Sequence, residues 1–324
     1  MPSIKKVRNW KEYNKNLVKR GAIIFTFDEK YLEELYFSGK QKRGGVKEYS
    51  EKMYEFLLTI KVMLRFPWRA TIGFAGGMLE RISSGQAKIP DYAHAAREAN
   101  KLDLKVKHYA PIKLSAGMDI AFDSTGVNVY GTSGWHQRKH GKDNLYKKRD
   151  QWKKIHLALD LDTMQIVSVT YTDSNVNDCE VVKELCDGIK GNVTSVRADG
   201  AYDTEEFYRI IHDWGAKAMI PAARTSKAQD ELKSRIKHQK PHLEQRDNMI
   251  KEIRKHENFD VGLKAWKMSS GYHRRSLVEA CMYRLKRTFG FNLQQKNDRG
   301  RRNEVITKIN LLNLMASFGK AEYC

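Results

Sequence analysis

The sequence has little cysteine and no long apolar run. Its 324 residues include only 4 cysteines, and none of these lies in a C-x-x-C pair, which excludes a disulfide scaffold and a cysteine-paired zinc or redox motif. The best apolar candidate, Phe56 to Phe66, is broken by Lys61 and Arg65 and is shorter than the roughly 18 residues that span a bilayer. The first six residues are basic but precede no apolar segment, so we expect neither secretion nor a membrane partner.

Motifs for nucleotide binding and for serine hydrolysis are also missing. The sequence contains no P-loop and no G-x-G-x-x-G after a predicted strand. Residue order suggests no Ser-His-Asp arrangement either. We therefore expect no small-molecule substrate.

Acidic residues are outnumbered, since 39 Asp and Glu face 59 Lys and Arg and leave a formal charge of +20. Such an excess favours a polyanionic partner such as nucleic acid, although charge does not distinguish binding from cutting. A hydrophobic content of 41% is enough for a folded core. The length suggests two domains of about 150 residues each.

The first hundred residues have the spacing of helices. Helical periodicity and stop signals predict helices over residues 47–64, 68–82 and 92–100, with Pro67 between the first two and Pro90-Asp91 starting the third. Three short helices with a turn before the last are typical of a helix-turn-helix DNA reader. A plain helical bundle has the same pattern, so the sequence leaves both interpretations open.

From about residue 111 the pattern changes to alternating strands and helices. We predict strands over residues 118–130, 154–160, 166–171, 193–198 and 216–221, and helices over 178–190, 204–214, 272–288 and 303–318. The polar stretch 224–258 is interpreted as exposed helix or loop. This order predicts an α/β layer with a mixed sheet.

Three acidic residues follow or interrupt these elements at chemically useful places. Asp123 ends an apolar strand, Asp199 follows another, and Glu279 lies within a predicted helix. Carboxylates at strand ends are exposed at the sheet edge, and hard cations such as Mg²⁺ prefer carboxylate oxygens. The ordinary alternatives are turns at Asp123 and Asp199 and a surface ion pair between Glu279 and Arg275.

The helix around Glu279 carries an unusual stripe. At 100° per residue, Tyr272, Arg275, Glu279 and Lys286 fall within about 60° of one another. A metal ligand flanked by groups that hold phosphates would explain this face, and a solvated ionic ladder is the alternative.

These residues resemble the signature of a known enzyme family. Tyr272-x2-Arg275-x3-Glu279-x6-Lys286 is similar to the Y-R-E-K motif of DDE transposases from bacterial and archaeal insertion sequences, of the insertion-sequence four/five-like group. Asp123-Ser-Thr-Gly and Ala198-Asp-Gly-Ala-Tyr-Asp resemble the first and second acidic motifs of that family. The resemblance implies an RNase H-like catalytic domain over residues 111–324, with Asp123, Asp199 and Glu279 as catalytic, metal-binding residues. It also implies a helical, DNA-end-binding domain over residues 1–110.

The resemblance implies a function as well. A transposase of this family would bind the terminal inverted repeats of an insertion sequence, cleave double-stranded DNA and transfer the strand into target DNA. Two Mg²⁺ ions would be required, with Mn²⁺ as a substitute, and the enzyme would act as a homodimer on paired ends in the cytoplasm of a prokaryote, associated with the nucleoid. The alternatives are a domesticated, non-catalytic DNA-binding protein derived from a transposase, and a nuclease or resolvase with the same core.

Basic residues near the predicted strands suggest DNA contacts beyond Tyr272, Arg275 and Lys286. Residues 136–154 hold eight Lys and Arg against two Asp, a net charge of +6. We predict DNA contacts there at Arg138, Lys139, Lys142 and Lys153. A zinc site at His136 and His140 is the alternative, which the adjacent cations disfavour. Residues 274–302, with net charge +7, form a second basic segment, and a solvated loop is the alternative there.

Overall fold

The computed structural model describes residues 7–23, 29–41, 43–83, 87–109, 117–129, 152–232 and 239–322. The chain forms two compact units. The first contains Met1–Lys107 and Thr288–Cys324, and the second contains His108–Arg287. The boundary predicted after residue 110 lies near the first junction, whereas residues 288–324 group with the N-terminal unit. The assignment of DNA-end binding to one domain and catalysis to the other stays a prediction.

The first unit is helical, as predicted. Its elements are α1 (Trp10–Gly21), α2 (Glu29–Glu33), α3 (Glu51–Leu64), α4 (Trp68–Ile82), α5 (Tyr92–Lys101), the short β6 (Asn292–Leu293) and α13 (Asp298–Ser317). Apolar faces of α3, α4 and α5 pack into one core. The Asp91 carboxylate caps α5 by accepting hydrogen bonds from the amides of Ala93 and His94.

The C-terminal helix α13 packs against α3 and α5 within this unit. It starts five residues earlier than predicted, because the Asn297 side chain caps it by accepting a hydrogen bond from the Gly300 amide at 2.7 Å. The side-chain amide of Asn303 donates to the carbonyls of Ala99 and Leu102. Because both carbonyls lie at the end of α5, these bonds hold the two helices together. None of the helices described in either unit combines the length and apolar character needed to cross a membrane.

The second unit is built on a mixed sheet. Its strands are β1 (Met118–Val129), β2 (Trp152–Asp160), β3 (Gln165–Asp173), β4 (Val193–Arg197) and β5 (Lys217–Met219). They are ordered β3-β2-β1-β4-β5. The first three form an antiparallel meander, and β4 and β5 continue the sheet parallel to β1. This is the RNase H-like arrangement, so the predicted fold class is confirmed.

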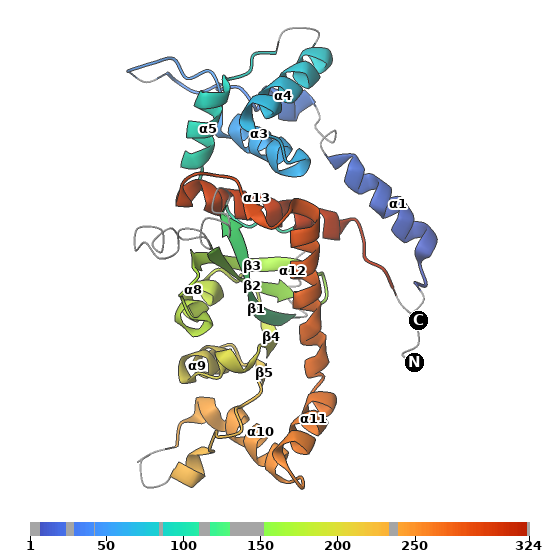
Figure 1. The fold of residues 1–324 in the computed structure, drawn as a ribbon, viewed down its shortest axis with the longest axis vertical. Coiled ribbons are helices and arrows are strands. Elements are labelled where there is room, and N and C mark those ends of the chain that lie inside the picture. The colour runs from blue at the N-terminus through green and yellow to red at the C-terminus, as the bar shows by residue number, and fades with distance from the viewer. Residues whose placement is uncertain are drawn as a thin grey trace, which may run out of the picture. The chain divides into compact units, whose positions relative to one another are not determined.

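Helices cover both faces of this sheet (Figure 1). In that view α8 and α9 lie on one side of the strands and α12 on the other. The helical elements described in this unit are η2 (Asp178–Val181), α8 (Val182–Asp187), η3 (Gly200–Tyr202), α9 (Glu205–Asp213), η4 (Gln229–Leu232), η5 (Pro241–Leu243), α10 (Glu244–Arg254), α11 (Phe259–Ser269), η6 (Tyr272–Arg275) and α12 (Ser276–Phe289). Ile120 and Phe122 of β1 point into a core with α8 and α9. Because side chains alternate along a strand, Asp119 and Asp123 point to the opposite face, toward η6 and α12.

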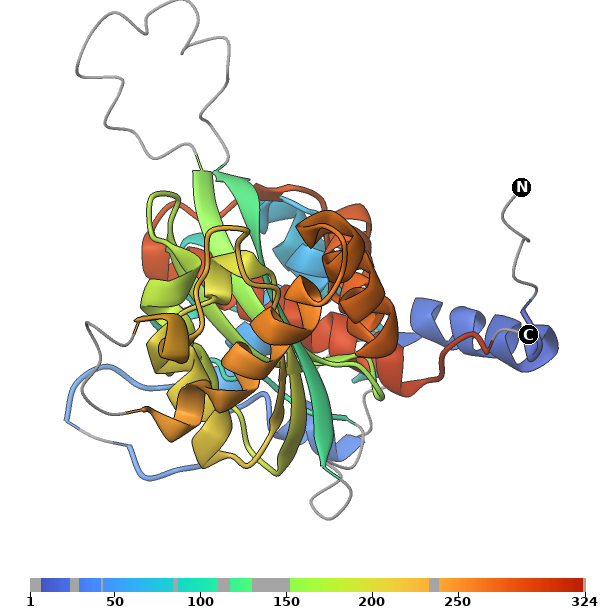
Figure 2. The ribbon, with the colours of Figure 1, turned by 90° about the horizontal axis from the view of Figure 1, so that it is seen from below.

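The polar stretch 224–258 is less exposed than predicted, and α11 was not predicted at all. Met249, Ile250 and Ile253 of α10 are buried together with Trp266 of α11. At Gly262 a Cβ atom would lie 1.9 Å from the carbonyl oxygen of Ile253, so only glycine permits this approach of α11 to α10. Figure 2 views the unit from the end where these two helices lie, with the sheet behind them.

The predicted helix 272–288 is interrupted at its start. Residues Tyr272–Arg275 form a 3-10 turn, and the α-helix begins only at Ser276. Gly271 precedes the turn with a φ of 73°, a left-handed conformation that glycine adopts without strain. The chain therefore reorients between α11 and α12, and the two arginines of the turn reach the sheet.

Candidate active site

Asp123 and Asp199 lie at equivalent points of two neighbouring parallel strands. Ala121 of β1 pairs with Arg197 of β4, and each aspartate lies two residues further along the chain. Asp199 follows the end of β4, as predicted, whereas Asp123 lies within β1 and not at its end, because β1 continues to Val129 in its pairing with β2. Asp199 also caps η3, since its carboxylate accepts a hydrogen bond from the Ala201 amide at 2.9 Å. The turn role considered for Asp199 is therefore present, whereas Asp123 is part of a strand and not of a turn.

Arg275 connects the first strand to the helix that carries Glu279. Its Nη1 lies 3.1 Å from Oδ2 of Asp123, and its Nη2 pairs with the Glu279 carboxylate one helical turn away. The Arg275 and Asp123 side chains are only 17% and 15% exposed, whereas Glu279 is 54% exposed. One guanidinium thus bridges two of the predicted catalytic acids.

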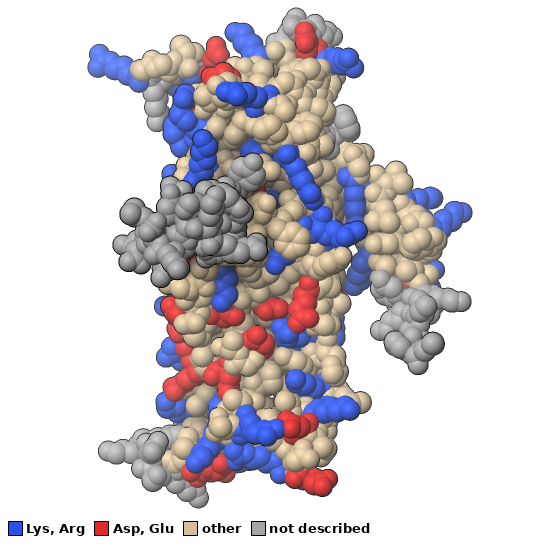
Figure 3. Space-filling model, viewed as in Figure 1, with Lys and Arg blue, Asp and Glu red and all other residues tan. Residues whose placement is uncertain are grey.

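The electrostatics place all three acids in one neighbourhood. Burial raises the pKa of Asp123, and the negative charges of Asp199 and Glu279 act in the same direction. The Ser124 amide and Arg275 oppose that rise in pKa. Figure 3 shows acidic side chains gathered on the face of the second unit between α8 and α9 on one side and α12 on the other. Such a cluster favours a bound cation, which would relieve the mutual repulsion.

The donor chemistry of the three acids fits a hard divalent cation, which binds carboxylate oxygens. Within the described ranges, however, no group of three or more His, Cys, Asp or Glu side chains is close enough to hold an ion as arranged. Arg275 lies between two of the three carboxylates.

Asp178, which the sequence analysis did not single out, contacts Ser124, the residue that follows Asp123. Its carboxylate accepts a hydrogen bond from the Ser124 hydroxyl at 3.0 Å and lies 2.7 Å from Nζ of Lys154 and 3.2 Å from Nδ1 of His156. Burial raises its pKa, but these three neighbours outweigh burial and hold the pKa well below its usual range. Asp178 is thus a charged anchor for the residue after Asp123, and no signal in the local sequence marks it.

The predicted stripe of four side chains is only partly present. Arg275 and Glu279 form the ion pair that was the ordinary alternative. Tyr272 is buried, with its ring 5.8 Å from that of Trp266 and Nζ of Lys267 5.3 Å from its centroid. Burial also lowers the pKa of Lys286, which is partly exposed on α12. Burial raises the pKa of Tyr272, the charges of Asp199 and Asp123 act in the same direction, and Arg275 opposes them. Tyr272 therefore lies beside the same site as Arg275, although it is not on an exposed helix face.

Of the four remaining predicted DNA contacts, one is buried and three lie outside the described residues. Lys153 of β2 is 3% exposed and ion-paired with Asp173, so it is not an accessible surface cation. Arg138, Lys139 and Lys142, and the histidine pair considered for zinc, lie outside the described residues. Their predicted roles stay predictions.

Two models of known protein families match this chain. Residues 115–314 match a family model described as "Transposase DDE domain", and residues 18–132 match a second model of the same description. The structure described as "Drosophila P element transposase strand transfer complex" aligns over 93% of this chain and 71% of that chain, with 9% sequence identity and a TM-score of 0.29. The structural likeness is too weak to bear on the site, whereas the first family match contains all three acids.

Proposed function

Because the chain belongs to the family of DDE transposases, we propose that Asp123, Asp199 and Glu279 are its catalytic residues and that it cuts and joins double-stranded DNA. As a DDE-type transposase it is a metal-dependent nuclease and transesterase. One observation supports the assignment of the site: β1 and β4 are neighbours in a register that places Asp123 and Asp199 at equivalent positions, and Arg275 links Asp123 to Glu279 on α12.

The proposed cofactor is a pair of Mg²⁺ ions, for which Mn²⁺ substitutes. Bound ions would lower the pKa of the attacking water or 3′-hydroxyl and stabilise charge on the leaving oxygen. Asp123, Asp199 and Glu279 would hold them through carboxylate oxygens. Arg275, once released from Asp123, would hold a phosphate beside the scissile bond, and Lys286 would contact a second phosphate along α12.

The proposed substrate is the terminal inverted repeat of an insertion sequence, followed by target DNA. A net charge of +20 supports a polyanionic substrate. The helical first unit is proposed to bind the DNA ends, with two copies of the chain pairing two ends. A prokaryotic, nucleoid-associated location follows from this substrate.

The alternative is a domesticated protein that binds DNA without cutting it. All three proposed catalytic acids are present, which argues against this alternative because carboxylates facing phosphate weaken binding. A nuclease or resolvase with the same core shares the cleavage step and lacks strand transfer. The products of a single reaction therefore distinguish the transposase from the non-catalytic binder and from the nuclease.

Removal of divalent metal tests the proposed function. The full-length protein is incubated with a labelled duplex that carries the element's terminal repeat, its flank and a target plasmid. With Mg²⁺ we expect cleavage that leaves a 3′-hydroxyl and then joined products, and with EDTA we expect binding alone. Binding without cleavage in Mg²⁺ would identify the non-catalytic alternative, and cleavage without joining would identify the nuclease.

Arg275→Gln should change the response of stability to metal. The wild-type guanidinium competes with cations for the Asp123 and Glu279 carboxylates, and without it those acids repel each other. We expect the metal-free melting temperature to fall by a few degrees and the Mg²⁺-induced rise to exceed that of the wild type. Thermal melts with and without Mg²⁺ measure both.

The matched control for this change is Arg224→Gln, which removes an arginine from an exposed pair with Asp260 in the same unit. It should leave the Mg²⁺-induced rise at the wild-type value. A smaller rise in Arg275→Gln than in the wild type would contradict competition between the guanidinium and the metal.

A further inference from the structure

A second polar cluster lies on β1 and β4, a few residues before two of the proposed catalytic acids in the sequence. Asp119 of β1 precedes Asp123 by four residues, and Arg197 of β4 precedes Asp199 by two. Even spacing along β1 places Asp119 on the same sheet face as Asp123, and Arg197, the last residue of β4, pairs with Asp119 on that face. Asp119 is 7% exposed and Arg197 is 6% exposed. Charges buried this deeply are held only where they are paired.

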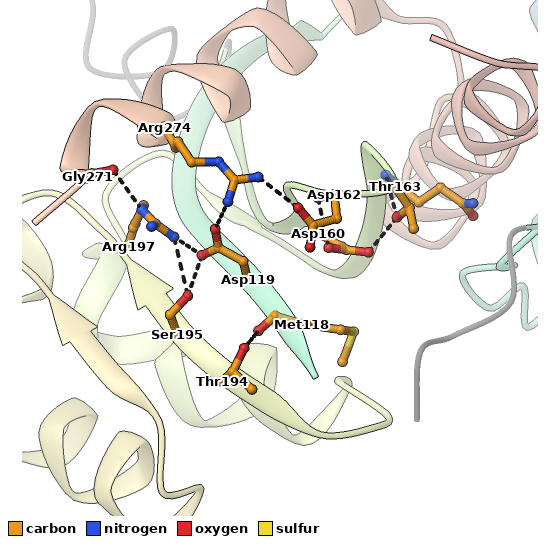
Figure 4. A network of polar contacts seen from close by, with 11 residues as sticks. Met118, Asp119, Asp160, Asp162, Thr163, Thr194, Ser195, Arg197, Gly271 and Arg274 are labelled. Atoms are coloured by element: carbon orange, nitrogen blue, oxygen red, sulfur yellow. Dashed lines mark hydrogen bonds and ion pairs between the residues drawn. The ribbon is translucent and has the colours of Figure 1, made fainter. Parts of the chain in front are cut away.

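Asp119, Ser195, Arg197, Arg274 and Asp162 form one network, here called the Asp119 network (Figure 4). The Asp119 carboxylate pairs with both Arg197 and Arg274 and accepts a hydrogen bond from the Ser195 hydroxyl. The second guanidinium nitrogen of Arg274 lies 2.8 Å from Asp162. The two arginines therefore meet at one buried carboxylate.

The network fastens the η6 turn to the sheet at two points. The Nε of Arg197 donates to the carbonyl of Gly271 at 3.1 Å, just before the turn, and Arg274 belongs to the turn itself. Neither attachment uses a proposed catalytic acid. Arg275 provides the third attachment, through Asp123, and it is the one that a cation or a phosphate at the acids would disrupt.

We propose that Asp119, Arg197 and Arg274 are positioning residues, which hold η6 and the start of α12 in place when Arg275 leaves Asp123. Through this turn they keep Arg275 and Glu279 aligned with the two strand-borne acids. The inference rests on the proposed function for its catalytic consequence. Its structural consequence, the anchoring of residues 271–276, can be measured without cleavage.

The test uses Arg274→Gln in the full-length protein. The Arg274 side chain is 45% exposed, so we expect the variant to fold. Hydrogen exchange of residues 271–276 in the metal-free protein should accelerate about tenfold, because two of the turn's ion pairs are lost. The nicking rate at saturating DNA should fall about 10- to 100-fold, the usual effect of removing a group that orients a metal ligand, with unchanged DNA affinity. Arg274→Lys keeps the charge and should recover part of the rate.

Arg246→Gln is the control for a general loss of stability. It removes the pair between Arg246 and Asp203 in the same unit, whose side chains are 18% and 10% exposed. Arg246 donates to Asp203 and to the carbonyl of Lys227, and neither of these belongs to η6. It should lower the melting temperature without accelerating exchange at residues 271–276. Equal acceleration in both variants, or unchanged exchange and nicking in Arg274→Gln, would overturn the proposal. A wild-type protein that does not nick would refute the proposed function, while the exchange result would still decide whether the network anchors the turn.

Discussion

Replacing Asp199 with Asn should eliminate nicking of a terminal-repeat duplex in Mg²⁺ while DNA binding survives. The amide keeps the size of the side chain and one oxygen acceptor, so the cap on the Ala201 amide can persist. It removes the negative charge that a divalent ion requires. Loss of one carboxylate from a metal site costs several kcal/mol of transition-state stabilisation, which corresponds to a rate decrease of roughly 10³-fold.

The measurement is the single-turnover nicking rate beside a binding titration on the same duplex. Asp213→Asn is the matched control, because this variant makes the same chemical change outside the site. Asp213 is 70% exposed at the end of α9. The control should nick at the wild-type rate. Wild-type nicking by Asp199→Asn would remove this residue from the proposed catalytic set.

Phe207→Ala should cause the largest loss of stability among single changes near the site. Phe207 of α9 is 0% exposed, and its ring lies 5.1 Å from that of Phe122 and 5.7 Å from that of Tyr202. Phe122 immediately precedes Asp123, and Tyr202 follows Asp199 by three residues. Truncating a fully buried phenylalanine typically costs about 3–5 kcal/mol, from lost burial and the cavity that remains.

Urea unfolding followed by near-ultraviolet absorbance or fluorescence measures this loss. Phe291→Ala is the matched control, since that ring is 57% exposed, and it should change the free energy of unfolding by no more than about 0.5 kcal/mol. A loss below about 1 kcal/mol for Phe207→Ala would mean that the core beneath the two aspartates repacks. In that case the acids would not depend on this aromatic cluster for their position.

Much of the fold could be predicted because its signals are local. Pro67 separates α3 from α4, Asp91 begins α5, and alternating apolar residues mark β1. The position of Asp199 after a strand follows from the same kind of signal, whereas Asp123 lies within β1 and not at its predicted end. These features depend on neighbours within a few residues, so one sequence is enough to find them.

The prediction failed where local and long-range preferences differ. The segment 224–258 appeared polar throughout, yet three apolar residues of α10 and Asp247 are buried, and α11 packs closely on this helix at Gly262. The helix predicted from Tyr272 begins with a 3-10 turn, because its arginines pair with carboxylates of the sheet. The charge of Lys153 suggested a DNA contact, but a partner twenty residues away holds this side chain in the interior.

The sequence by itself determined that the chain carries three acids on or beside two strands and a helix, amid an excess of positive charge. Only the tertiary structure decided which cations meet which acids: Arg275 reaches Asp123 across 152 residues of sequence, and Arg274 reaches Asp119 across 155. Helical spacing relates residues three or four apart, whereas these partners are chosen by the register of β1 with β4 and by the turn that begins at Gly271. Those constraints arise only when the sheet and its helices have packed.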